Sequence, residues 1–168
     1  GRTVPIRSGV RGTRARWLQM ARTNAELGLA MKASSRASVR EQLEALQHAL
    51  GLERVPQRIE CFDVSHTMGE SAIASCVVFG SEGPLKGDYR RFNLKGLTPG
   101  DDYAGMRQAV GRHFVRVLRG EGVMPDLLLI DGGEGQLQAA REALATAGVE
   151  GLLTVGVAKG ADRRAGQE

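Results

Sequence analysis

Two aspartates at the ends of two apolar segments are the residues best suited to chemistry in this sequence. Asp63 lies in the segment Arg-Ile-Glu-Cys-Phe-Asp-Val-Ser-His, and Asp131 follows the apolar run from Leu127 to Ile130. That run is too short for a helix and is bounded by turn residues, as is typical of a buried central strand. Carboxylates that converge from neighbouring strands repel each other unless they share a proton or bind a cation. An oxygen-only site suits a hard divalent metal, so we expect Mg²⁺ or Mn²⁺.

The hydrophobic pattern places these acids in a mixed α/β domain. Alternating or continuous apolar runs predict five strands, at residues 59–66, 71–79, 85–94, 127–130 and 152–158. Short turns join the first three into an antiparallel meander, and helices that begin near Asp102 and Gly135 connect the rest. A right-handed crossover can place the fourth strand beside the first, which brings Asp63 and Asp131 together. The predicted fold is a five-stranded mixed sheet with the topology of ribonuclease H-like nucleases.

The first 57 residues form a separate, basic and mainly helical segment. Residues 1–40 carry nine Lys or Arg and one acid, whereas the rest of the chain carries 14 basic and 18 acidic residues. We expect a short strand at residues 3–7 and helices over residues 14–31 and 41–50, with the catalytic domain occupying residues 58–168. A basic arm beside an acidic body favours a polyanionic partner, with nucleic acid first. A basic solvated surface explains the same composition equally well.

The cysteines and the hydropathy of the sequence indicate the cellular compartment. Cys61 and Cys76 both lie in predicted strands, which favours reduced core residues over a disulfide or a metal site. The sequence contains no run of transmembrane length and no signal peptide, so we expect a cytoplasmic protein with no membrane partner. Because the first residue is Gly1 and not Met, we also expect the sequence to be part of a longer chain.

Several strings in order resemble one known family. FDVSHTMGE, YRRFNLKG, TPGDDYAGM, PDLLLIDGGEGQ and GVAKGADR are similar to the C-terminal endonuclease half of UvrC, the incision subunit of bacterial nucleotide excision repair. The similarity runs from about Arg58 to the last residue. It implies a divalent-metal-dependent endodeoxyribonuclease that cuts damaged double-stranded DNA on the 5′ side of a bulky lesion. It also implies UvrB as partner, with UvrA upstream in the pathway.

The resemblance assigns roles to three acids. Asp63 and Asp131 match the family's metal-binding carboxylates, and Asp102 matches a third acid needed for activity. From spacing alone, the simpler interpretation of Asp102 is a helix N-cap. The family's catalytic His and its helix-hairpin-helix domain lie beyond Glu168, and His66 is not that His. We therefore expect this chain alone to be weakly active or inactive.

Candidate phosphate-binding residues follow the last two predicted strands. They are Gly132, Gly133, Gln136, Lys159, Arg163 and Arg164. Backbone N–H groups at the start of a helix suit a phosphate, although close strand–helix packing explains the glycines too. The three cations suit phosphate contacts or simply a solvated loop. Glu134 stands where the family usually has Lys, which reverses a charge near the expected site.

Two other functions remain open at this point. An endonuclease V-like nuclease shares an Asp-Val-Ser first strand, an Asp-Gly turn and a Gly-Val-Ala-Lys strand, but the GDDYAGM and DGGEGQ strings favour UvrC. A non-catalytic ribonuclease H-like module that binds nucleic acid or protein is the third possibility. The presence of Asp63, Asp102 and Asp131 together argues against that module.

Overall fold

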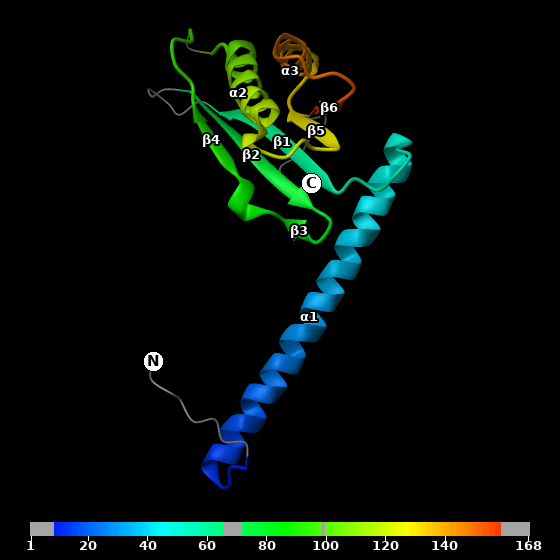
Figure 1. The fold of residues 1–168 in the computed structure, drawn as a ribbon, viewed down its shortest axis with the longest axis vertical. Helices are drawn as coiled ribbons and strands as arrows, with labels where there is room; N and C mark the ends of the chain where they lie inside the picture. The colour runs from blue at the N-terminus through cyan, green and yellow to red at the C-terminus, as the bar shows by residue number, and fades with distance from the viewer. Residues whose placement is uncertain (1–8, 66–71, 99, 159–168) are drawn as a thin grey trace.

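A mixed β-sheet with helices on both faces forms the body of the protein, and a long helix extends away from it (Figure 1). The computed structural model of the chain describes residues 9–65, 72–98 and 100–158. The strands are β1 (Arg58–Ser65), β2 (Ile73–Gly80), β3 (Gly83–Pro84), β4 (Arg90–Asn93), β5 (Leu127–Asp131) and β6 (Leu153–Val157). The α-helices are α1 (Thr13–Leu50), α2 (Asp102–Arg116) and α3 (Glu134–Ala147), with short turns of helix at Lys86–Asp88 and Val117–Glu121.

The strand order is β3-β2-β1-β5-β6, and β4 also pairs with β2. β1 and β2 are antiparallel, whereas β1 pairs with β5, and β5 with β6, in parallel. This arrangement confirms the predicted mixed sheet, including the placement of the fourth expected strand beside the first. Crossover helices α2 and α3 cover one face of the sheet, as parallel connections require.

The third expected strand, residues 85–94, is not continuous. Residues 83–84 and 90–93 pair with different parts of β2, and a short 3₁₀ turn at Lys86–Asp88 separates them. Gly87 and Asp88 favour a turn over an extended strand. Asp88 Oδ2 also accepts a 2.6 Å hydrogen bond from Arg58 at the start of β1, which fixes the turn against the sheet edge.

The N-terminal segment is one helix of 38 residues where two were predicted. The serines at 34, 35 and 38 do not interrupt it, because their side chains are exposed and cost a helix only a few tenths of a kcal/mol each. The helix ends at Gly51, whose φ of 62° is the left-handed C-terminal conformation that glycine adopts most easily. The short strand predicted at residues 3–7 lies outside the described residues.

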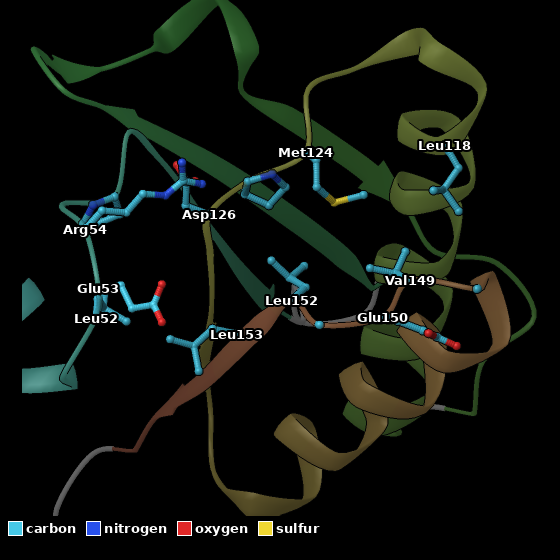
Figure 2. Close-up of a pocket in the computed structure, with 14 residues that line it drawn as sticks. Leu52, Glu53, Arg54, Leu118, Met124, Asp126, Val149, Glu150, Leu152 and Leu153 are labelled. Carbon is cyan, nitrogen blue, oxygen red and sulfur yellow. The ribbon is translucent and has the colours of Figure 1, made fainter.

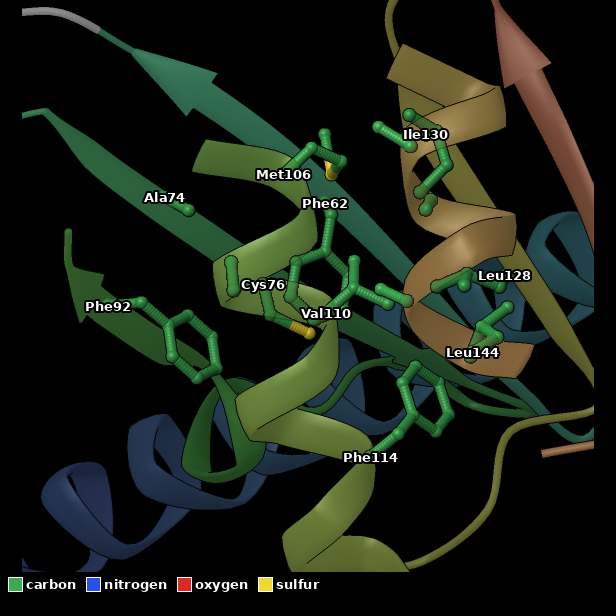
Figure 3. Packing of buried hydrophobic residues seen from close by; sticks show 14 of the residues in the cluster. Phe62, Ala74, Cys76, Phe92, Met106, Val110, Phe114, Leu128, Ile130 and Leu144 are labelled. Atoms are coloured by element: carbon green, nitrogen blue, oxygen red, sulfur yellow. The ribbon is translucent and has the colours of Figure 1, made fainter. Parts of the chain in front are cut away.

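Two apolar clusters pack on opposite faces of the sheet. The larger one lies between the sheet and helices α2 and α3, and Figure 3 shows Phe62, Met106, Val110, Phe114 and Ile130 within it. The smaller one forms on the opposite face, where Leu43 of α1 packs on Ile59 and Leu127. The C-terminal end of α1 therefore covers the part of that face where β1 and β5 begin, and the rest of α1 projects beyond the sheet (Figure 1).

Candidate functional site

The acid pair is built by the parallel pairing of β1 with β5. Phe62 is the register partner of Ile130, and the next residue on each strand is an aspartate, Asp63 or Asp131. Adjacent strands lie about 4.8 Å apart, so the two acidic residues stand side by side at the carboxyl ends of their strands. Because Phe62 and Ile130 point into the core under α2 and α3, both carboxylates point to the opposite face. Both aspartates are half-buried.

Burial and both carboxylates raise the pKa of the Cys61 thiol. Cys61 lies two residues before Asp63, on the same face of β1. Burial raises the pKa of this thiol to about 11, and the negative charges of Asp131 and then Asp63 add to the increase. The Asp63 and Asp131 carboxylates therefore act on the same small region of the sheet. Such a region, with oxygen donors from both strands, fits a hard divalent cation.

Asp102 is not the helix cap. The cap of α2 is Asp101, whose Oδ1 accepts a 2.9 Å hydrogen bond from the backbone N–H of Ala104. The N-cap interpretation of Asp102 is therefore wrong, and the cap belongs to its neighbour. Asp102 is the first residue of α2, and its Oδ2 lies 3.5 Å from Nε2 of Gln136 at the start of α3. The third acid and one of the predicted phosphate-binding residues thus meet where the two helices begin.

The glycines after β5 allow this close approach. A Cβ on Gly132 would lie 1.5 Å from Oε1 of Gln136, and a Cβ on Gly135 would lie 2.6 Å from the ring of Tyr103. A side chain at position 132 would displace the Gln136 side chain that contacts Asp102, and one at position 135 would push Tyr103 of α2 away from the start of α3. Tyr103, Gly135 and Gln136 line a pocket of about 380 Å³ together with Asp102, Gly133 and Glu134.

The remaining predicted site residues divide into two groups. Gly133 precedes α3 as its N-terminal flanking residue, and Glu134 is exposed in the first turn. Lys159, Arg163, Arg164 and His66 lie outside the described residues, so their predicted roles stay predictions.

A larger pocket of about 660 Å³ lies at the other edge of the sheet (Figure 2). Its lining includes Leu52, Met124 and Val149, together with an ion pair in which Arg54 Nη2 lies 2.8 Å from Asp126 Oδ1. It opens at the amino-terminal ends of β5 and β6. Ligands of open α/β sheets bind at the carboxyl ends of the strands, where the acids are. This pocket is therefore separate from the candidate site.

A buried polar cluster was missed by sequence reasoning. Glu60 is fully buried and accepts hydrogen bonds from Arg58 at 2.8 and 3.0 Å. His113 Nε2 lies 2.7 Å from the other carboxylate oxygen of Glu60, and Cys76 Sγ is close to both. The sequence did contain an indication of this cluster. Side chains alternate between the two faces of a strand, so Glu60 lies on the same core face of β1 as Phe62. Glu60, Cys76 and His113 carry metal-ligating atoms within 4.8 Å of one another.

The existing contacts make a structural role the better explanation of this cluster. A metal ion would have to displace the hydrogen bonds that Glu60 already receives on both oxygens. The Arg58 guanidinium, 2.8 Å from that carboxylate, would also repel an added cation. Glu60 is instead a buried charge whose partners satisfy it, as buried charges require.

Comparison with known proteins decides the family. The family model described as the UvrC RNAse H endonuclease domain matches residues 47–168. The chain belongs to this family. It is 56% identical over 168 residues to UvrABC system protein C of Ectopseudomonas mendocina (strain ymp), covering 100% of this chain and 28% of that protein. It is 54% identical, with the same coverage, to UvrABC system protein C of Alkalilimnicola ehrlichii. The UvrC resemblance predicted from the sequence is thus confirmed, and the chain spans about a quarter of the length of these curated relatives.

Solved structures give a more distant likeness. Ciona intestinalis endonuclease V in complex with a 24mer DNA containing an inosine aligns with 83% of this chain and 60% of that chain, at 16% identity and a TM-score of 0.48. At these values the likeness carries no argument about function. Among the described helices of this UvrC-family chain, none is both long and apolar enough to cross a membrane.

Proposed function

We propose that this chain is the nuclease domain of a UvrC-type excision nuclease, which hydrolyses a phosphodiester bond of damaged duplex DNA on the 5′ side of a bulky lesion. The observation that carries the proposal is the register of β1 and β5, which sets Asp63 beside Asp131 at the carboxyl ends of two parallel strands. The family assignment supports it, because the matching relatives are UvrABC system proteins C.

The oxygen-only donor set of two neighbouring carboxylates, both of which act on Cys61, fits a divalent cation, Mg²⁺ or Mn²⁺. Asp63 and Asp131 would hold it, and when bound it lowers the pKa of a coordinated water and stabilises the leaving oxygen. The family resemblance makes Asp102, at the start of α2, a third acid needed for activity, and Gln136 orients its carboxylate by donating from Nε2. The backbone N–H of Gly132 already donates to the carbonyl oxygen of Val157 at 3.2 Å, so the N–H of Gly133, at the start of α3, is the one in this turn that suits a phosphate oxygen of the substrate.

The partners in this proposal are UvrB and, earlier in the pathway, UvrA. The support is the family, since the relatives are named as parts of the UvrABC system. The chain covers 28% of those relatives, so the rest of the protein supplies further contacts and, by the resemblance, the catalytic His. Lys159, Arg163 and Arg164 are proposed to contact phosphates beyond the end of β6.

The test uses the full-length protein that contains this chain, together with UvrA, UvrB and a duplex carrying one bulky adduct. Asp63→Asn and Asp131→Asn each remove one charged ligand and should reduce 5′ incision by more than about 100-fold, since even losses outside the ligand shell typically cost about 10–100-fold. Glu150→Gln is the matched control, because it makes the same change of charge at an exposed residue beside the distant pocket. Retained incision by either aspartate variant would contradict the proposal. Cleavage of an inosine-containing duplex without partners would instead favour the endonuclease V-like alternative.

A further inference from the structure

A row of polar residues crosses the sheet at the level of the acid pair. Asp63 is the register partner of Ser75 on β2, and Ser75 is the register partner of Arg91 on β4. On the other side, Asp131 is the register partner of Val157 on β6. Residues directly opposite each other on paired strands point to the same face of a sheet. Arg91, Ser75, Asp63 and Asp131 therefore share the face that lies opposite α2 and α3.

Arg91 differs from Arg90 beside it. Arg90 Nη1 donates to the carbonyl oxygens of Gly87, at 3.1 Å, and Tyr89, at 2.9 Å, so its guanidinium helps to hold the turn before β4. Within the described part of the chain, Arg91 is exposed. Other arginines there form ion pairs, such as Arg58 with Asp88 and Arg107 with Glu142, but Arg91 forms none. Its positive charge is therefore available to a ligand on the acid-bearing face.

The part of this face around the row is accessible. α1 covers the other half, where Leu43 packs on Ile59 and Leu127. Near the acids, Val77 is 42% exposed and Val157 is 48% exposed. Among the described residues, then, no helix covers the surface between Arg91 and Asp131.

The spacing of the row matches a nucleic-acid backbone. Two strand-to-strand steps of about 4.8 Å place the Cα of Arg91 about 10 Å from that of Asp63, and a long arginine side chain can shorten that gap. A cation held by Asp63 and Asp131 would attract one phosphate. The guanidinium of Arg91, two strands away, offers a planar and permanently charged donor to the neighbouring phosphate. Guanidinium geometry suits bidentate phosphate binding.

We propose that Arg91, helped by the hydroxyl of Ser75, binds a phosphate next to the one that is cut, so that the cleaved strand crosses the open face from β5 towards β4. This inference rests on the proposed nuclease function and names Arg91 as a positioning residue for it. Removing a contact that is made equally before and during the reaction raises KM and leaves kcat nearly unchanged.

The test compares Arg91→Gln with Arg119→Gln in the full-length protein, assayed with UvrA, UvrB and the adduct-bearing duplex. Arg119 is exposed in the turn after α2, so its replacement makes the same change of charge away from the acid-bearing face. Arg91→Gln should raise KM about tenfold, keep kcat within about twofold, and reduce the slope of log affinity against log salt by about 0.9, the value for one phosphate contact. Arg91→Lys keeps the charge without the planar donor pair, so it should restore the salt slope and only part of the KM increase.

Binding to the same duplex, measured by fluorescence anisotropy with Asp63→Asn in the background, separates this inference from the proposed function. If the wild-type protein binds but does not cut, the proposed function is wrong, and the binding slope still decides the role of Arg91. If Arg91→Gln and Arg119→Gln have the same KM and salt slope, the inference is overturned. A fall in kcat with unchanged KM would also overturn it, because that pattern belongs to a residue acting only in the transition state.

Discussion

Phe62 on β1 and Ile130 on β5 are partners in a parallel pair, and an aspartate follows each of them. The core therefore determines the chemistry: packing these two apolar side chains under α2 and α3 forces Asp63 and Asp131 to the other face, side by side. A shift of one residue in either strand would bury an aspartate, at a large cost in free energy. The acid pair is thus held in place by the same register that stabilises the fold.

Asp63→Asn or Asp131→Asn should raise the melting temperature of the metal-free protein slightly. The reason is that one of two neighbouring negative charges is removed while the shape of the side chain is kept. Thermal melts with and without Mn²⁺ measure this directly. The wild-type protein should gain stability from Mn²⁺ by mass action, and each variant should gain much less. An equal gain from Mn²⁺ in the wild type and both variants would place the metal elsewhere.

The adjacent acids Asp101 and Asp102 should separate stability from activity. Asp101→Ala removes the cap of α2 and should lower the free energy of unfolding by about 1 kcal/mol, with incision per folded molecule nearly unchanged. Asp102→Asn leaves the cap intact and should reduce incision at least about tenfold with little effect on stability. Urea unfolding and incision assays on the same two variants test this. The reverse pattern would show that Asp102 supports the helix and Asp101 the chemistry.

The sequence predicted the acid pair because two short-range signals agreed. Apolar runs that ended at Asp63 and Asp131 defined two strands, and the helical pattern between them required a crossover that could make the strands neighbours. The break between β3 and β4 was missed although Gly87 and Asp88 favour a turn, because the Arg58–Asp88 ion pair at 2.6 Å that fixes this turn joins residues far apart in the sequence. The buried Glu60 was missed for the same reason, since its partner His113 is 53 residues away in the chain. The role proposed for Arg91 could not be inferred without the register of three strands.

Cys61 should report the charge state of the acid pair. Burial, then Asp131 and Asp63, raise the pKa of this thiol to about 11, so at pH 8 nearly all of it is protonated and unreactive. Neutralising either carboxylate lowers that pKa and increases the thiolate fraction. Alkylation by iodoacetamide should therefore be faster in Asp63→Asn and Asp131→Asn than in the wild type, measured with Cys76 replaced by Ala. Unchanged rates in both variants would mean that the carboxylates do not act on the thiol.

Glu60→Gln tests whether the buried cluster is structural. Removing one partner of a buried ion pair typically costs about 3–5 kcal/mol, because Arg58 and His113 would keep their buried donors without a carboxylate. We expect a decrease of that order in chemical denaturation, with no dependence on added Zn²⁺ or on a chelator. The control is Glu150→Gln, an exposed acid outside this cluster. If a chelator lowered the stability of the wild-type protein but not that of Glu60→Gln, this cluster would bind a metal instead.

The projecting half of α1 should bind DNA through one basic stripe. At about 100° per residue, Arg14, Arg22, Lys32, Arg36 and Arg40 fall within an arc of about 80° on the helix surface. All five are exposed, and the stripe is continuous with the side of Leu43 that packs on the sheet. Arg36 and Arg40 already bind Glu82 and Glu44, at 2.6 and 2.8 Å. Arg22 lies 3.3 Å from Glu26 in an exposed pair, which is weak, so the outer three cations are the main candidates for phosphate contacts.

Replacing Arg14, Arg22 and Lys32 together by Gln should weaken DNA binding and reduce the salt slope by about 0.9 for each phosphate that is no longer bound. The matched control replaces three exposed cations outside the stripe, Arg16, Lys86 and Arg119, which changes the net charge by the same amount. Comparing the two at several salt concentrations distinguishes a local contact from a general electrostatic effect. Equal slopes for both triple variants would mean that the stripe is solvated or that it faces another protein surface. A smaller slope for the stripe variant alone would make α1 a second DNA contact, remote from the acids, that holds the duplex while the sheet positions the strand to be cut.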